Sequence, residues 1–428
     1  MDENNDASRR ADEPVILERA QHPISRRDID PDALKILYRL DHLGFIACLC
    51  GGAVRDLMLG KRPKDFDIVT DARPGQIKKR FGNVYVIGRR FRLAHIHFSG
   101  GKIIEVATFR KDPGPGEENA PETDHDPKNA YGTPREDAFR RDITINALLY
   151  DAASASVVDY VGGLEDLARR RVRVIGDPAE RFTEDPVRIW RVIRHAARLG
   201  FDIDEATAMA VRSHGHLLAA SPGSRLYEEL NKDLAYETRP VIQELRRFGV
   251  LKHFLGRLGE DLETDSVMFA KLVSLLTVID GAKAAKCELS LDETYTLLFR
   301  PWFQPLFEGQ EGDMQPVLIK AFEDARMTLT VPRIVRANAV QTLIIVESML
   351  KALRTGRMSW SLQRRTHYAQ ASRLAFLIEK GRAPGAEESF EGLFRAAFPC
   401  AAVGSPRKRR RRRRKPADRG GTSGGNIA

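Results

Sequence analysis

The sequence predicts an α+β protein: a mixed α/β head with a small mixed or antiparallel sheet, then an all-helical neck and body, then a disordered basic tail. Three observations lead to this prediction. Short apolar segments typical of strands alternate with helical segments through the first third of the chain. From Asp177 onward, strand signals become scarce and amphipathic helical periodicity replaces them. Residues 407–415 are nine consecutive cations, which cannot form a core.

The chain of 428 residues has room for several domains. Its composition shifts set their expected boundaries. The segment 111–134 is rich in Pro, Gly, Asp, Glu and Asn and is expected to be a flexible surface loop of the head. We expect a disordered N-terminus at 1–28, a head at 29–160, a helical neck at 161–238, a helical body at 239–403 and a disordered Arg-rich tail at 404–428.

The head begins with a helix that has clear sequence signals at both ends. Asp30 is a good N-cap, Pro31 suits the first turn, and Gly44 ends the apolar stripe. The next elements follow from runs of apolar residues. Strands are expected at 45–50, 66–70, 84–87, 93–98, 102–109, 157–160 and 172–175, and helices at 54–59 and 74–81. The last half of 135–148 is expected to be a helix or helix–strand junction.

The second half of the sequence reads as helices separated by glycines. Gly200 and Gly223 mark two of the breaks. No internal repeat is evident. Helices are expected at 186–199, 205–218, 224–236, 240–248, 266–279, 291–299, 316–325, 332–355 and 361–380.

The positive charge of the chain is concentrated in the tail. The net charge is +10, and removing the nine cations of 407–415 leaves +1, so the rest of the chain is nearly neutral. Arginine dominates the tail and suits phosphate recognition, so we expect an arm that binds RNA or another polyanion. A simple solubility tail is the alternative.

No apolar run is long enough to span a membrane, and the N-terminus lacks a signal-peptide core, so a cytoplasmic location without membrane contact is expected. Four cysteines in a chain of this length do not form a disulfide framework. Cys48 and Cys50 alternate with Leu49 on an apolar segment. We interpret them as small core residues rather than metal ligands, because no partner pair is nearby.

The chemistry of the head is indicated by a glycine pair and two acids. Gly51 and Gly52 precede a short helix and allow backbone amides to approach a phosphate closely. Asp65 and Asp67 are two residues apart on the predicted strand, so their side chains are expected on one face. Two neighbouring carboxylates repel each other, and a divalent cation relieves that repulsion. The pattern predicts metal-assisted chemistry at phosphorus.

Five segments, in this order, resemble the class II nucleotidyltransferases of the DNA polymerase β superfamily, which comprise tRNA CCA-adding enzymes and bacterial poly(A) polymerases. Each segment alone is a weak signal, and the ordered set is a strong one. One small departure is Ile143, where the family commonly has Phe. The segments are 51–56, 65–67, 140–148, 184–191 and 225–232.

The resemblance implies that Asp65 and Asp67 hold two Mg²⁺ ions, with Mn²⁺ as an alternative, for attack of an RNA 3′-hydroxyl on the α-phosphate of a nucleotide. Asp142 is the expected third acid. Glu105, between Ile104 and Val106 on a predicted strand, is its competitor and is otherwise an edge residue of the sheet.

The resemblance also implies the nucleotide-binding residues. Gly52 and Arg55 match the triphosphate contacts, and Arg140 or Arg141 reaches the nucleotide while the other forms a structural ion pair. The stripe that begins at Asp185 matches the residues that recognise the base. Without the resemblance, Asp185 is a helix cap and the arginines are a solvated face. The stripe comprises Asp185, Arg188, Arg191 and Arg194.

Two features favour the poly(A) polymerase branch of this family. Segment 86–96, with Arg89 and Arg90 as expected RNA contacts, resembles the signature of that branch, as does the tail. His95 and His97 alternate on this strand and are expected to be satisfied strand residues, although a metal or acid–base role stays open. The expected tail contacts to RNA are Arg409, Arg410, Arg411 and Arg412.

The expected activity is therefore template-independent addition of AMP from ATP to RNA 3′ ends, with release of pyrophosphate, by a monomer that binds RNA largely independently of sequence. CCA addition to tRNA is the first alternative. A non-catalytic RNA-binding protein with a transferase-like head is the second, and the intact Asp65 and Asp67 argue against it.

Overall fold

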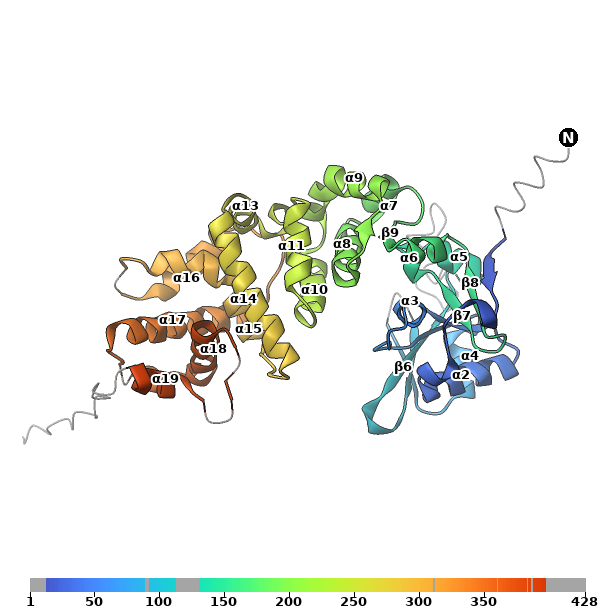
Figure 1. The fold of residues 1–428 in the computed structure, drawn as a ribbon, viewed down its shortest axis with the longest axis horizontal. Coiled ribbons are helices and arrows are strands. Elements are labelled where there is room, and N and C mark those ends of the chain that lie inside the picture. The colour runs from blue at the N-terminus through green and yellow to red at the C-terminus, as the bar shows by residue number, and fades with distance from the viewer. Residues whose placement is uncertain are drawn as a thin grey trace, which may run out of the picture. The chain divides into compact units, whose positions relative to one another are not determined.

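The computed structural model describes residues 13–88, 92–112, 131–310, 312–359, 361–382, 384–385 and 388–397. It confirms the α+β class with a sheet-containing head and a helical remainder (Figure 1). The described chain divides into two compact units. The first runs to Asp280 and includes Ile319–Pro332, and the second comprises Gly281–Leu318 and the chain from Arg333. The expectations for Arg89, Arg90, most of loop 111–134 and the tail arginines lie outside the described residues.

The head is built on a sheet whose described strands run in the order β1-β8-β7-β2-β3-β6-β5-β4. Neighbouring strands are antiparallel except for β3 and β6, which are parallel, so the expected mixed character of the sheet is confirmed. Its strands are β1 (Val15–Leu17), β2 (Ala47–Cys50), β3 (Asp67–Thr70), β4 (Val84–Ile87), β5 (Leu93–His97), β6 (Ile103–Thr108), β7 (Leu149–Asp151) and β8 (Ser156–Asp159).

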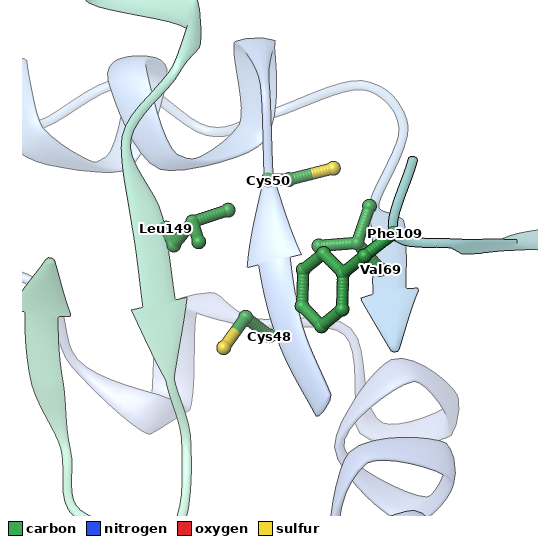
Figure 2. Packing of buried hydrophobic residues seen from close by; sticks show 5 residues of the cluster. All are labelled: Cys48, Cys50, Val69, Phe109 and Leu149. Atoms are coloured by element: carbon green, nitrogen blue, oxygen red, sulfur yellow. The ribbon is translucent and has the colours of Figure 1, made fainter. Parts of the chain in front are cut away.

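The two faces of this sheet differ along β5 and β6, where buried and accessible residues alternate. Helix α2 (Pro31–His42) packs against β2 and β3, and α4 (Pro74–Arg80) packs against β4 and β5. On the face that carries Cys48 and Cys50, the two thiols are buried among Val69, Phe109 and Leu149 (Figure 2). The prediction that the two cysteines are core residues is confirmed.

The prediction of disorder for 1–28 is wrong for the described part of that segment. Strand β1 pairs with the sheet edge at β8, and two short 3-10 helices follow, η1 (Arg19–Gln21) and η2 (Arg26–Asp28). His22 and Ile24 are buried, and a His22 ring nitrogen is hydrogen-bonded to the Ala155 carbonyl at 2.9 Å. The backbone pairing of β1 with β8 and the buried side chains of His22 and Ile24 hold this segment against the head, although its composition is polar.

Small elements complete the head and lead into the neck. The predicted strand at 172–175 is reduced to Arg171–Val172, with an isolated bridge between Val174 and Ile143. These small elements are α3 (Gly52–Met58), η3 (Ser99–Gly101), α5 (Pro134–Phe139), η6 (Thr144–Asn146), α6 (Gly163–Ala168), β9 (Arg171–Val172), α7 (Pro178–Glu184) and β10 (Asp202–Ile203).

The expected helices of the neck are present with small shifts of their ends. The helix predicted over 205–218 ends at His214 and continues as the 3-10 helix η7, which starts at Gly215. The remaining elements of the first unit are α8 (Val187–Leu199), α9 (Glu205–His214), η7 (Gly215–Ala220), α10 (Gly223–Leu234), α11 (Arg239–Arg247), α12 (Lys252–Leu255), α13 (Arg257–Thr264) and most of α14 (Ser266–Ala284).

Helices also build the second unit, where α17 packs against α15 and α18. Buried Glu293 of α15 accepts two hydrogen bonds from Arg373 of α18. The helix expected at 361–380 is divided. No helix among the described residues is long and apolar enough to cross a membrane. The elements are α15 (Leu291–Phe303), η8 (Gln304–Phe307), α16 (Met314–Asp324, which extends into the first unit), α17 (Arg333–Thr355), η9 (Leu362–Arg364), α18 (Tyr368–Lys380) and α19 (Phe390–Ala397).

Candidate active site

The glycine pair lies where β2 ends and α3 begins. Gly51 has φ +70°, a conformation that L-residues with a side chain rarely adopt. A Cβ atom on Gly52 would lie 3.3 Å from Nη2 of Arg55, so the guanidinium of Arg55 lies directly against this glycine. The Arg55 side chain is only 11% exposed. The structure therefore brings together Gly52 and Arg55, the two residues expected to contact the triphosphate.

The carboxylates lie beside the glycine pair because β3 is the neighbour of β2. In this antiparallel pair, Asp67 is opposite Cys50, the residue before Gly51. Asp65 precedes the strand, which starts at Asp67 rather than at Phe66 as expected. On the other side of β3, Ile68 is paired with Val106, so the register one step earlier places Asp67 beside Glu105.

Glu105 continues a row of accessible side chains across the sheet. Its cross-strand partner is His95, whose Nε2 lies 3.3 Å from a Glu105 carboxylate oxygen. His95 in turn is paired with Tyr85 on β4. Because paired residues of neighbouring strands project to the same face, Glu105 and Asp67 share a face of the sheet.

The pKa of Asp67 is raised to about 6. Removal of water by the surrounding protein is the largest cause, followed by the negative charges of Glu105 and Asp65, while Arg141 acts in the opposite direction. The ionised form of Asp67 is therefore disfavoured next to the carboxylates of Glu105 and Asp65. Among the described residues no group of three or more His, Cys, Asp or Glu side chains is arranged to hold a metal ion.

Arg140 and Arg141 are both held by Asp137, a fully buried acid of α5. Arg140 donates to Oδ1 of Asp137 at 2.9 and 2.6 Å, and Arg141 donates to Oδ2 at 3.1 and 2.9 Å. Burial alone would raise the pKa of Asp137, but the two arginines outweigh burial and lower it. Nη1 of Arg141 would lie 3.6 Å from a Cβ on Gly51, so this ion-pair cluster supports the glycine pair from behind.

One face of α8 meets the segment that begins at Asp142. Arg188 contacts one Asp142 carboxylate oxygen at 3.2 Å, and Arg191 contacts the other at 2.7 Å. Arg188 also donates to Glu184 at 2.8 Å. The structure thus places Asp142 in ion pairs with the neck helix, whereas it is Glu105 that acts electrostatically on Asp67.

Asp185 lies at the junction of α7 and α8. Its two carboxylate oxygens accept from the two terminal nitrogens of Arg225 of α10, at 3.0 and 2.9 Å. Oδ1 also accepts from the backbone of Val187, so Asp185 has a capping contact as well. The bidentate pair fixes the plane of the carboxylate.

Arg194 is not brought together with the other predicted nucleotide contacts. It is buried between α8 and α10, where its guanidinium donates to Asp233 and Glu229. Asp233 is fully buried and also accepts from the indole of Trp190 at 2.7 Å and from Arg198 at 2.9 Å. The contacts of Arg194 are those of a residue that joins two helices.

Sequence reasoning missed three buried acids: Asp137, which holds Arg140 and Arg141 beside the glycine pair, and Glu229 and Asp233, which hold Arg194 between α8 and α10. Asp137 precedes Arg140 and Arg141 by three and four residues, a spacing that predicts ion pairs on a helix. Glu229 and Asp233 lie one turn apart on α10, but their partners are 35 to 43 residues away along the chain, so no local pattern identifies the pairs.

A contact between the head and the neck was also missed. Nζ of Lys64, the residue before Asp65, donates to the hydroxyl of Tyr236 at 2.6 Å and lies 4.4 Å from the ring centroid. Arg198 lies over the same ring at 4.8 Å. The carboxylate segment is therefore tied to the end of α10.

Comparison with protein families matches two segments of the chain. Residues 47–173 match the poly(A) polymerase head domain. Residues 200–261 match a domain described as the probable RNA- and SrmB-binding site of polymerase A. The first segment contains the glycine pair and the carboxylates, and the second contains α10.

Curated relatives agree with these matches. Poly(A) polymerase I of Salmonella typhimurium is 37% identical over 90% of this chain and 80% of its own length. Poly(A) polymerase I of Escherichia coli O6:H1 is 46% identical over 55% of this chain and 52% of its own length. The CCA-adding enzyme of Bacillus pumilus is 39% identical over 47% of this chain and 48% of its own length.

Solved structures share the fold at low sequence identity. A CCA-adding enzyme of Thermotoga maritima in complex with tRNA has a TM-score of 0.60 at 22% identity, covering 90% of this chain and 86% of that one. An apo CCA-adding enzyme has a TM-score of 0.63, with the same identity and coverage. With the site geometry and the relatives, the chain belongs to the poly(A) polymerase family of nucleotidyltransferases and is a polynucleotide adenylyltransferase.

Proposed function

We propose that this enzyme extends RNA 3′ ends with AMP units taken from ATP and releases pyrophosphate. The observation that carries the proposal is the register of the head sheet. It places Asp67 beside the glycine pair on one side and beside Glu105 on the other. A phosphate-binding turn and a group of carboxylates therefore share one edge of the sheet, as transfer to phosphorus requires.

The donor set of this edge fits divalent cations. Asp65, Asp67 and Glu105 offer only carboxylate oxygens, which Mg²⁺ and Mn²⁺ accept as ligands. Burial and the charges of Glu105 and Asp65 raise the pKa of Asp67, and a bound cation would counter the repulsion among these carboxylates. We propose that Asp65 and Asp67 hold two Mg²⁺ ions. When bound, the ions lower the pKa of the attacking hydroxyl and stabilise the charge of the leaving pyrophosphate.

Glu105 is the better third acid of the two candidates. Its negative charge contributes to the raised pKa of Asp67, and the register places it on the same face. Asp142 instead has one arginine on each of its oxygens. We propose that Asp142 orients Arg188 and Arg191 toward the nucleotide rather than binding metal.

The proposed nucleotide contacts come from the head and the neck. Gly52 and Arg55 bind the triphosphate, because the glycine permits close approach and the guanidinium supplies charge-assisted hydrogen bonds. Arg141 lies against Gly51 and supports the glycine pair. Asp185 and Arg188 offer an acceptor and a donor for the edge of the adenine base. Arg194 takes a structural role in this proposal, because its partners are Asp233 and Glu229.

RNA is the proposed second substrate. The segment 200–261 matches a family domain described as a probable RNA-binding site. The cations of 407–415 suit a contact with phosphates that is independent of sequence. Both substrates are cytoplasmic, and we propose that location for the enzyme.

Incubation of the full chain with a generic RNA primer and each nucleoside triphosphate in turn tests the proposal. We expect long products with ATP and little extension with CTP, GTP or UTP. Absence of extension with ATP under both Mg²⁺ and Mn²⁺ would refute it. The matched control is the double variant Asp65→Asn and Asp67→Asn, which should bind RNA but not extend it.

CCA addition is the second candidate, because relatives named CCA-adding enzymes match the chain and share its fold. A tRNA that lacks its 3′-terminal CCA distinguishes the two activities. Addition of C, C and A followed by a stop would support this second candidate. Continued addition of A to the same tRNA would support poly(A) synthesis.

A further inference from the structure

A chain of hydrogen bonds links the glycine pair of the head to the neck helix α8. Nε and Nη2 of Arg55 donate to Asp56 at 2.9 and 2.7 Å, and Nη1 donates to the side-chain oxygen of Asn146 at 2.7 Å. The amide nitrogen of Asn146 lies 3.3 Å from Nε2 of His195. The reaction proposed above uses Arg55 but assigns nothing to Asn146 or His195.

The direction of each hydrogen bond follows from Arg55, because a guanidinium has donors and no acceptor. The oxygen of Asn146 must therefore face Arg55, and its NH₂ group must face His195. An NH₂ group only donates, so Nε2 of His195 accepts and the imidazole is neutral, with its proton on Nδ1. The flipped orientation would turn the NH₂ group toward Arg55, which has no acceptor, so the Arg55 contact alone fixes the amide and with it the tautomer of His195.

The surroundings of His195 keep it neutral. Burial is the largest cause that holds its pKa well below the ordinary value, and the charges of nearby arginines act in the same direction. In a protonated ring Nε2 would carry a proton, so two donors, Nε2–H and the NH₂ group of Asn146, would face each other. The arginines are Arg55, Arg191, Arg194 and Arg198.

His195 belongs to the face of α8 that meets the head. It follows Arg188 by seven residues, about two helical turns, so the two side chains project in nearly the same direction. Arg188 and Arg191 bind Asp142. His195 contacts Asn146, which follows Asp142 by four residues. This face of α8 therefore meets a single short segment of the head at three positions.

We propose that His195 is a positioning residue for the nucleotide triphosphate: it fixes the amide of Asn146, which in turn keeps the guanidinium of Arg55 against the glycine pair. The inference rests on the proposed role of Arg55 in triphosphate binding. Loss of the acceptor on His195 leaves the amide free to turn its NH₂ group toward Arg55. Among the described residues, Asp56 is then the remaining hydrogen-bond acceptor for the Arg55 guanidinium, and it binds Nε and Nη2 but not Nη1.

The variant His195→Phe keeps a ring of similar size and removes the acceptor. We expect the Kd of the full-length enzyme for a non-hydrolysable ATP analogue to rise about 3- to 10-fold, as for the loss of one orienting hydrogen bond. The Kd for adenosine, which carries no phosphate, should change less than about twofold. In primer extension, the KM for ATP should rise while kcat is nearly unchanged. His42→Phe, an exposed position on α2, is the matched control and should alter none of these values.

Rescue by a different acceptor separates positioning from packing. His195→Gln offers a side-chain carbonyl and should restore most of the ATP affinity. Asn146→Ala should weaken ATP binding to a similar extent, and the double variant Asn146→Ala with His195→Phe should be no weaker than Asn146→Ala alone, because the two residues act in series.

Three results would overturn the inference: equal losses for ATP and adenosine, unchanged ATP affinity in His195→Phe, or additive losses in the double variant. If His195→Phe fails to fold, as judged by circular dichroism, the ATP affinities of His195→Gln and Asn146→Ala test the positioning role instead. Normal ATP affinity in Asn146→Ala would then refute the role. The proposed function fails separately, when wild-type enzyme with normal ATP binding does not extend RNA.

Discussion

The substitution Asp137→Asn tests how much the buried acid of α5 contributes to the site. Asp137 is fully buried and accepts two hydrogen bonds each from Arg140 and Arg141, and a fifth from the backbone of Arg110 at 3.2 Å. Asparagine keeps the size but removes the charge and turns a donor group toward guanidinium donors. Breaking one partner of a buried ion pair costs about 3–5 kcal/mol. Arg140 is 27% exposed, so water recovers part of this loss, and we expect about 3 kcal/mol.

Urea unfolding followed by far-ultraviolet circular dichroism measures this loss. The pH dependence gives a second reading. The pKa of Asp137 is lowered in the folded protein, so its contribution is fully present above the unfolded pKa of about 4 and is lost as the pH falls through the folded value. The difference between wild type and Asp137→Asn should therefore be constant near neutral pH and shrink at acid pH.

Glu165→Gln is the matched control, because Glu165 and Arg169 form an ion pair in which both side chains are more than half exposed. This change should alter the free energy of unfolding by less than about 1 kcal/mol. A loss in Asp137→Asn no larger than that of Glu165→Gln would refute the reasoning. So would a difference from wild type that grows as the pH falls.

Four further outcomes follow from the site. Asp65→Asn should reduce primer extension to background without a change in melting temperature, and measurable extension would contradict its metal role. Glu105→Gln should lower kcat, whereas Asp142→Asn should mainly raise the KM for ATP; equal losses of kcat would contradict our choice of third acid. Arg225→Met should lower the preference for ATP over CTP in primer extension, because it removes the ion pair that fixes the carboxylate of Asp185. An unchanged ratio of ATP to CTP incorporation would contradict this. Deletion of 407–428 should weaken RNA binding and flatten its dependence on salt, and an unchanged slope would show that the tail is not an RNA arm.

The sequence predicts the head well where local chemistry determines structure. Asp30 accepts from the backbone amides of Asp32 and Ala33, as expected for an N-cap before Pro31. The proximity of Glu105 to Asp67 could not be predicted, because it depends on the parallel pairing of β3 and β6. The N-terminal strand was missed for a similar reason: three apolar residues in a polar segment become a strand only when the edge of β8 is available.

Helix α8 shows why a sequence stripe can combine residues with different roles. Arg188, Arg191 and Arg194 recur every three residues, but a helix needs 3.6 residues per turn, so the stripe rotates by about 60° at each step. Arg194 therefore projects about 120° away from Arg188 and meets α10 instead of the head. His195, seven residues after Arg188, returns to the face that meets the head. The correct helical period thus groups His195 with Arg188, and the one-residue difference between 194 and 195 separates a helix-joining residue from a positioning residue.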